Sequence, residues 1–143
     1  MPIRTAEAQW TGTVTEGKGT VTLGSGAFTG PYSFTSRMGE GAGTNPEELL
    51  GAAHAGCFTM ALSAQLTRAG FTPGRLHTDA KVRFDKVDGG FAITRIDLIN
   101  EAEVPGIDDA AFQKHALDAK QNCPLSKALA GTEIHLQAQL KNT

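Results

Sequence analysis

The chain has 143 residues, of which 40% are hydrophobic and 20% charged, and its formal net charge is -2. This composition is typical of one globular domain, and a chain of this length buries about two-thirds of the surface that it exposes when unfolded. No excess of lysine or arginine is available to neutralise a phosphate backbone, so we expect no nucleic-acid partner. No apolar run approaches the roughly 20 residues that span a bilayer, and we expect a cytoplasmic protein that does not bind membranes.

The first third of the sequence has the pattern of short strands. Residues 7–17, 19–26 and 31–37 alternate in a strand-like way between turn residues, which predicts three antiparallel strands. A glycine-rich loop, MGEGAGT, follows at 38–44 and leads directly to a helix start. Asn45 is a good N-cap residue there, because its side chain can accept a hydrogen bond from the first helical turn.

The middle of the chain predicts a buried helix and then a hairpin. Residues 46–68 are apolar or small on nearly every side, which is typical of a helix buried all round, and Gly70 provides the stop. Residues 76–104 predict a long β-hairpin that turns at VDGG, because Asp-Gly and Gly-Gly are strong hairpin signals.

The last third predicts two helices and one strand. Residues 107–123 form an amphipathic pattern, a short helix begins at Pro124, and residues 131–142 alternate as a closing strand. Strands, long helix, hairpin, helices and strand in this order define an α+β fold. We found no linker or repeat, and we expect one domain over residues 1–143.

The chain has two cysteines, Cys57 and Cys123. In a reducing cytosol an isolated pair suggests redox catalysis, metal binding or simple burial, and a permanent disulfide is least expected. Burial is the stronger interpretation of Cys57 alone, because free cysteine is among the most buried residue types. Cys123 directly precedes Pro124, a helix start, where free N–H groups and the helix dipole would stabilise its thiolate.

Arg37 and Glu48 are the next candidates. Each has an ordinary explanation, because Glu48 stands where a glutamate closes a capping box and Arg37 lies in a loop. In a functional site, the arginine would stabilise the Cys57 thiolate while the glutamate held the guanidinium by a two-point contact. Glu48 and Cys57 are nine residues apart and point in nearly opposite directions on an unbroken helix. If Glu48 and Cys57 serve one site, either a second subunit completes that site or the helix breaks at Gly51 or Gly56. A break there would set Cys57 at a helix N-terminus.

A metal site is a weaker hypothesis. His54 and Cys57 share a helix face, and with Cys123 they make three soft ligands, but the other histidines are scattered. The GEGAGT run lacks the third glycine of a dinucleotide loop. We expect neither a metal nor a cofactor.

The run SRMGEGAGTNPEELLGAAHAGCFTMAL, followed some sixty residues later by NCPLSKAL, resembles the osmotically inducible protein C (OsmC) family, which is related to the organic hydroperoxide resistance proteins. The likeness covers essentially the whole chain. It implies antiparallel sheets around a long buried helix and an intertwined homodimer with its sites at the subunit interface. It also implies a thiol peroxidase that reduces organic hydroperoxides to alcohols.

The same resemblance implies a role for each candidate residue. Cys57 matches the peroxidatic cysteine, Cys123 the resolving cysteine, and Arg37 and Glu48 match the arginine and glutamate. Cys57 would become a sulfenic acid and Cys123 would condense with it to a disulfide. An external dithiol, for which the resemblance suggests a lipoylated protein, would reopen that bond.

Two other functions remain open from the residues. The cysteine pair would equally support a dithiol/disulfide oxidoreductase that acts on protein thiols, with little rate gain for peroxides. A non-catalytic stress-response binding protein would have the same fold with inert thiols. The sequence also leaves open which hydroperoxide is preferred and whether hydrogen peroxide is used.

Overall fold

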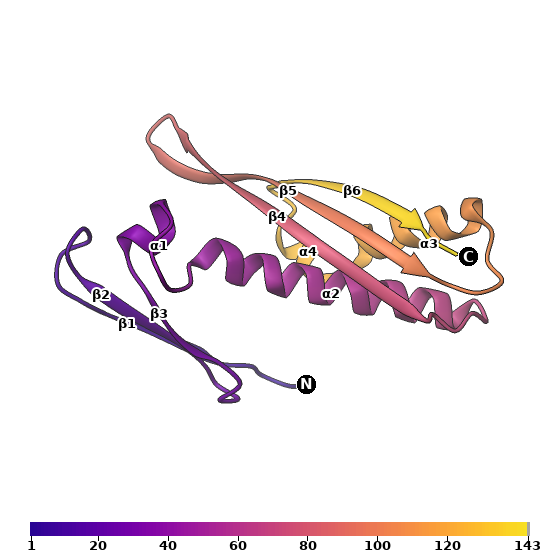
Figure 1. Cartoon of the computed structure of the whole chain (residues 1–143), viewed down its shortest axis with the longest axis horizontal. Coiled ribbons are helices and arrows are strands. Elements are labelled where there is room, and N and C mark those ends of the chain that lie inside the picture. The colour runs from indigo at the N-terminus through magenta and orange to yellow at the C-terminus, as the bar shows by residue number, and fades with distance from the viewer. Residues whose placement is uncertain (143) are drawn as a thin grey trace. The chain divides into compact units, whose positions relative to one another are not determined.

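The computed structural model describes residues 1–142, and its backbone divides into two compact units, Met1–Leu49 and the chain from Leu50 onward. Figure 1 shows the elements in chain order. They are β1 (Ala6–Thr11), β2 (Lys18–Leu23), β3 (Thr29–Tyr32), α1 (Phe34–Met38), α2 (Pro46–Arg68), β4 (Arg75–Val87), β5 (Gly90–Glu103), α3 (Asp109–Asn122), α4 (Pro124–Ala128) and β6 (Glu133–Leu140). The predicted α+β class is confirmed.

The first unit contains an antiparallel sheet of order β1-β2-β3, as its alternation predicts. The strand expected at 31–37 is wrong beyond Tyr32, because the chain turns into α1. Ser33 and Ser36 form a capping box, in which the Ser33 Oγ accepts from the Ser36 N–H at 3.2 Å. The Ser36 Oγ accepts from the Ser33 N–H at 2.8 Å in return. The capping box satisfies two backbone N–H groups, and this favours a helix here over the strand that the short alternating pattern predicts.

The first unit buries small and polar groups rather than large apolar ones. Its buried residues among those described are Gly19, Gly30, Ser36, Thr44 and Glu47. Its larger apolar side chains are open to solvent, with Trp10, Phe28 and Phe34 exposed by 36%, 39% and 38%. A small sheet needs a hydrophobic face of three or more strands, or packing against a helix, to be stable by itself.

Helix α2 begins and ends where the sequence predicts. The Asn45 Oδ1 accepts from the Glu48 N–H at 2.8 Å, and Gly70 beyond its end has φ +93°. The break considered at Gly51 or Gly56 is absent, since the helix is continuous from Pro46 to Arg68. At Gly51 a Cβ would lie 3.3 Å from the Val82 Cγ2, so this glycine lets the helix approach β4 closely.

The expectation that α2 is buried on every side is wrong for the single chain. One stripe, formed by His54, Phe58, Leu62 and Leu66, is fully buried. Another stripe, formed by Ala52, Ala53, Gly56 and Met60, is exposed, and Met60 is 76% exposed. By length and composition α2 would suffice to cross a membrane, a criterion that core helices of soluble proteins also meet.

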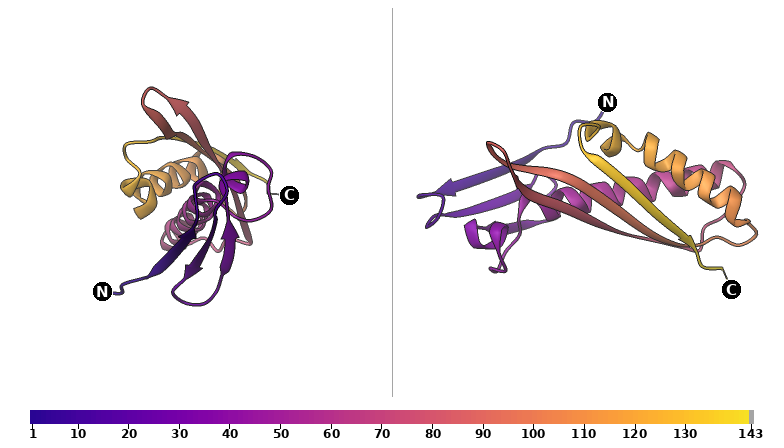
Figure 2. Two further views of the ribbon diagram at one scale, coloured as in Figure 1. Left: turned by 90° about the vertical axis from the view of Figure 1, so that its left-hand side faces the viewer. Right: turned by 90° about the horizontal axis from the view of Figure 1, so that it is seen from above.

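The second unit contains a sheet of order β4-β5-β6. Strands β4 and β5 form the predicted antiparallel hairpin, and Gly89 and Gly90 at its turn have φ of +86° and +148°, which favour glycine. Strand β6 returns parallel to β5. Two further views show α3 running alongside β6 (Figure 2). The core joins the buried stripe of α2 to Ile96 and Leu98 of β5 and Phe112 of α3.

Candidate active site

The two cysteines meet in the second unit. Cys57 lies within α2 and Cys123 lies between α3 and α4, and their Sγ atoms are 2.9 Å apart. Both are free thiols; Cys123 is buried and Cys57 is partly buried. A disulfide bond is about 2.05 Å long. The thiols are therefore within reach of bond formation after a small movement, although 66 residues separate them in the sequence.

Local sequence explains how Cys123 is held at this place. Its N–H donates to the Ala119 carbonyl at 2.9 Å, which closes the last turn of α3. The following Pro124 disfavours a helical backbone at the residue before it. Cys123 accordingly has φ -56° and ψ 129°, and the chain bends there before α4 begins.

Cys123 is the N-cap residue of α4, as the sequence predicts, and the first turn of α4 also acts on Cys57. In the described part of the chain the Cys123 side chain makes no cap hydrogen bond to α4. The backbone N–H of Leu125, in the first turn of α4, stabilises the thiolate form of Cys57 and so lowers the pKa of that thiol. Cys57 lies in mid-helix rather than at a helix N-terminus, and this backbone N–H belongs to another helix.

The surroundings of Cys57 favour its protonated form. Burial raises the pKa of the Cys57 thiol, and the thiol–thiol hydrogen bond with Cys123 raises this pKa further. The Leu125 N–H opposes both effects because it stabilises the thiolate. A nearby cation would lower this pKa and favour the thiolate.

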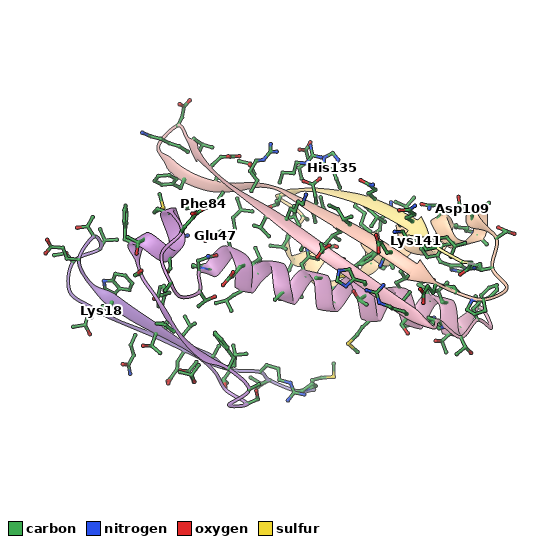
Figure 3. All side chains as sticks on the ribbon, in the orientation of Figure 1. Lys18, Glu47, Phe84, Asp109, His135 and Lys141 are labelled. Atoms are coloured by element: carbon green, nitrogen blue, oxygen red, sulfur yellow. The ribbon has the colours of Figure 1, made fainter. Side chains whose placement is uncertain are left out.

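Arg37 occupies the last turn of α1 in the first unit and makes a two-point contact with Glu47. Its Nε and Nη2 donate to the Glu47 Oε1 at 3.0 and 2.7 Å. The Glu47 side chain is only 9% exposed, whereas that of Arg37 is 43% exposed. Figure 3 shows Glu47 at the start of α2. A carboxylate held this way fixes the plane of the guanidinium.

This contact falls one residue away from the position that the sequence suggested. The expected two-point partner of Arg37 was Glu48, but the observed partner is Glu47. One residue rotates a helical side chain by about 100°, and the Glu48 carboxylate accepts from the Thr44 Oγ1 at 2.7 Å. The sequence reasoning missed Glu47 because either glutamate suits the first helical turn.

Hydrogen bonds across the glycine loop bring the end of α1 to the start of α2. The Ser36 Oγ donates to the Thr44 carbonyl at 2.7 Å, and the Asn45 Nδ2 donates to the Ser36 carbonyl at 3.1 Å. Gly43 has φ +117°, and a Cβ there would lie 2.6 Å from the Pro31 carbonyl oxygen. This position of the loop therefore requires glycine.

His54, considered above as a metal ligand, forms a hydrogen bond with a serine. Its Nε2 lies 2.9 Å from the Ser126 Oγ, and both residues are buried. Among the described residues no group of three histidine, cysteine or acidic side chains is placed to hold a metal ion. Ser126 was not singled out in the sequence, where it is one polar residue of a short helix.

Two free thiols within bonding reach are typical of redox proteins, and comparison identifies the family. Residues 39–138 match the family model described as OsmC-like protein, and the chain belongs to this family. It is 52% identical over 137 residues to Peroxiredoxin OsmC of Escherichia coli (strain K12), covering 95% of each chain. The organic hydroperoxide resistance protein of Xanthomonas axonopodis pv. citri (strain 306) is 38% identical over 92 residues, covering 64% of this chain and 63% of that protein.

Solved structures agree with this family. The organic hydroperoxide resistance protein OhrB of Bacillus subtilis superposes with a TM-score of 0.69 at 26% identity, covering 96% of this chain and 98% of that chain. The predicted resemblance to OsmC and to the organic hydroperoxide resistance proteins is thus confirmed.

Proposed function

We propose that this protein is a thiol-dependent peroxidase that reduces organic hydroperoxides to alcohols. The observation that carries the proposal is the 2.9 Å contact between the Cys57 and Cys123 sulfurs. A peroxidase of this type needs one thiol to react and a second within bonding reach. The relatives named for peroxiredoxin activity and hydroperoxide resistance support the same function.

The reaction follows from the roles of the two thiols. The Cys57 thiolate attacks the distal oxygen of the hydroperoxide, the O–O bond breaks, and the leaving alkoxide takes a proton to become the alcohol. Cys57 is now a sulfenic acid. The Cys123 sulfur attacks the Cys57 sulfur, water leaves, and a disulfide forms. An external dithiol, for which we propose a lipoylated protein of the cytoplasm, returns both thiols by exchange.

Steady-state consumption of tert-butyl hydroperoxide separates this function from its two alternatives. With dihydrolipoamide as reductant we expect turnover at least tenfold faster than with glutathione at equal thiol concentration, because a dithiol completes the exchange intramolecularly. A general dithiol/disulfide oxidoreductase would exchange with dihydrolipoamide but accelerate peroxide loss little. A non-catalytic binding protein would leave the peroxide unchanged with either reductant.

We propose that the Arg37 guanidinium is the cation that stabilises the Cys57 thiolate. Burial raises the Cys57 pKa, so a nearby guanidinium would restore the ionised form at neutral pH. The two-point contact with Glu47 supports this assignment, because it would aim the guanidinium without neutralising it by proton transfer. Glu48 was the glutamate implied by the resemblance, and the contact with Arg37 favours Glu47 for that role.

Two matched substitutions distinguish the adjacent glutamates. Glu47→Gln is expected to lower kcat/KM for tert-butyl hydroperoxide about tenfold, because the amide carries no negative charge and its NH2 group replaces one of the two acceptor oxygens that face Arg37. Glu48→Gln is the matched control and is expected to stay within about twofold of the unmodified protein. The opposite ranking would return the orienting role to Glu48.

We propose a homodimer in which the site is completed between subunits. The unbroken α2 supports this arrangement, because it places Glu47 and Cys57 ten residues, about 15 Å, apart along one helix. Of the two solutions derived from the sequence, this excludes the helix break and leaves the second subunit. The exposed stripe of α2 and the exposed aromatic residues of the first unit also support it. Apolar surfaces of this kind are typical of subunit contacts.

Mixing two inactive variants tests this arrangement. Arg37→Ala and Cys57→Ser homodimers each lack one component in both sites. If Arg37 serves the Cys57 of the partner subunit, random heterodimers contain one intact site, and the mixture recovers about a quarter of the unmodified activity. If both residues act within one chain, subunit exchange recovers nothing. Light scattering of the unmixed proteins checks that each is a dimer.

A further inference from the structure

A second contact between α2 and α4 lies beside the thiol pair. His54 precedes Cys57 by three residues, and Ser126 follows Cys123 by three residues. The His54 Nε2 is 2.9 Å from the Ser126 Oγ, and the two sulfurs are 2.9 Å apart. Residues three apart lie on the same face of a helix. The two contacts therefore join the same segments, one helical turn apart.

His54 is an unusual residue for its surroundings. It is fully buried in the stripe of α2 that otherwise consists of Phe58, Leu62 and Leu66. The His54 Nδ1 is buried without a hydrogen-bond partner among the described residues. A buried polar atom without a partner costs free energy that an apolar side chain of similar size would not. Packing alone therefore does not account for a histidine here.

The protonation state of His54 is determined by its neighbours. Burial lowers the pKa of His54, so the ring is neutral at physiological pH. A proton on Nδ1 would be a buried donor without an acceptor. The proton therefore resides on Nε2, which donates to the Ser126 Oγ. With this donor committed to Ser126, His54 is linked to α4.

Helix α4 depends on such an attachment. It has five residues, Pro124–Ala128, and a helix this short is not stable by itself. It begins directly after Cys123, and its first turn holds the Leu125 N–H, which favours the Cys57 thiolate. Displacement of α4 from α2 would thus separate the two sulfurs and remove the backbone donor together.

We propose that the His54–Ser126 hydrogen bond is a positioning device for disulfide formation, which holds the Cys123 thiol against Cys57. This inference rests on the proposed peroxidase function. The Cys57 sulfenic acid has two fates: attack by Cys123 with loss of water, or reaction with a second hydroperoxide, which gives a sulfinic acid and one further alcohol. A close, oriented Cys123 favours the first fate because it raises the effective concentration of that thiol.

The test compares variants that remove the hydrogen bond with variants that retain it. His54→Leu and Ser126→Ala remove it; His54→Gln retains an N–H at similar reach, and Ser126→Thr retains the hydroxyl. Intact mass after graded cumene hydroperoxide gives the ratio of sulfinic acid to disulfide. We expect this ratio to rise about five- to tenfold in His54→Leu and Ser126→Ala, the equivalent of one buried hydrogen bond. His54→Gln and Ser126→Thr are expected to restore it toward the unmodified value.

Two further measurements separate positioning from a general loss of structure. The rate of Cys57 oxidation by the first hydroperoxide is expected to stay within about twofold in all variants. Displacement of α4 removes both the Cys123 hydrogen bond, which raises the Cys57 pKa, and the Leu125 N–H, which lowers it, so the two changes oppose each other. The double variant is expected to be no worse than either single variant, because both remove the same contact. An unchanged ratio in His54→Leu and Ser126→Ala, or additive effects in the double variant, would overturn the inference.

Equilibration with a glutathione redox buffer tests the same geometry without peroxide. The equilibrium constant for the Cys57–Cys123 disulfide reports the effective concentration of the two thiols, and we expect it to fall by the same factor in His54→Leu and Ser126→Ala. If the unmodified protein forms this disulfide in the buffer but does not react with hydroperoxides, the result would contradict the peroxidase function alone. Equal constants in all variants would contradict the positioning role alone.

Discussion

Cys57→Ser is expected to abolish hydroperoxide reduction, with a fall in kcat/KM of at least about a thousandfold. A serine hydroxyl in the same partly buried place remains protonated at neutral pH and is a far weaker nucleophile toward a peroxide oxygen. The substitution is nearly isosteric, so the α2 stripe around Phe58 keeps its packing. Loss of cumene hydroperoxide with dihydrolipoamide as reductant measures the effect.

The thermal unfolding midpoint of Cys57→Ser provides the control. A midpoint within a few degrees of that of the unmodified protein shows that the lost activity is chemical. Activity that persists in Cys57→Ser with Cys123 still present would assign the reactive thiol to Cys123, and the roles of the two cysteines would have to be exchanged.

Cys123→Ser is expected to separate the first step from the second. The rate at which the first equivalent of cumene hydroperoxide oxidises Cys57 is expected to fall little, because Cys57 itself is unchanged. No intramolecular disulfide then forms, and excess peroxide converts the sulfenic acid to sulfinic acid, a gain of about 32 Da over the thiol. Trapping with dimedone followed by intact mass distinguishes the two oxidation states.

We expect Cys123→Ser to lose repeated turnover, although it retains the first oxidation step. Within a few equivalents of peroxide, Cys123→Ser should become irreversibly inactive, whereas the unmodified protein should survive because its disulfide protects Cys57. Persistent clean turnover of Cys123→Ser without over-oxidation would show that Cys123 is not the resolving thiol.

Most elements of this fold were predictable because their signals are local. The turn at Asp88-Gly89, the cap at Asn45 and the stop at Gly70 each depend on a few neighbouring residues, and all three are confirmed. Helix α1 was missed because its capping box uses two serines rather than the usual glutamate partner.

Local signals do not predict which residues contact one another in the candidate site. The sequence identified Cys57, Cys123 and Arg37, but their partners depend on which face of a helix meets which neighbour. Glu47 rather than Glu48 meets Arg37, and the first turn of α4 also acts on Cys57. The first outcome depends on a rotation of about 100° between adjacent residues of a helix, and the second on how α4 packs against α2. Composition and spacing determine neither.

The exposed stripe of α2 has a different origin. The sequence indicates a helix that is apolar all round, and the single chain covers only part of it. A pattern of apolar residues predicts that a surface is buried, but it does not predict whether the same chain or another chain buries it. The subunit-mixing experiment addresses this point directly.

The most direct test of the central claim is the intact mass and free-thiol count of the reduced, chelator-treated protein before and after one equivalent of cumene hydroperoxide. We expect rapid loss of both thiols and of about 2 Da per chain, the signature of a Cys57–Cys123 disulfide, with hydrogen peroxide acting more slowly in parallel. Survival of both thiols would mean that Cys57 and Cys123 are packing residues, and would contradict the peroxidase function.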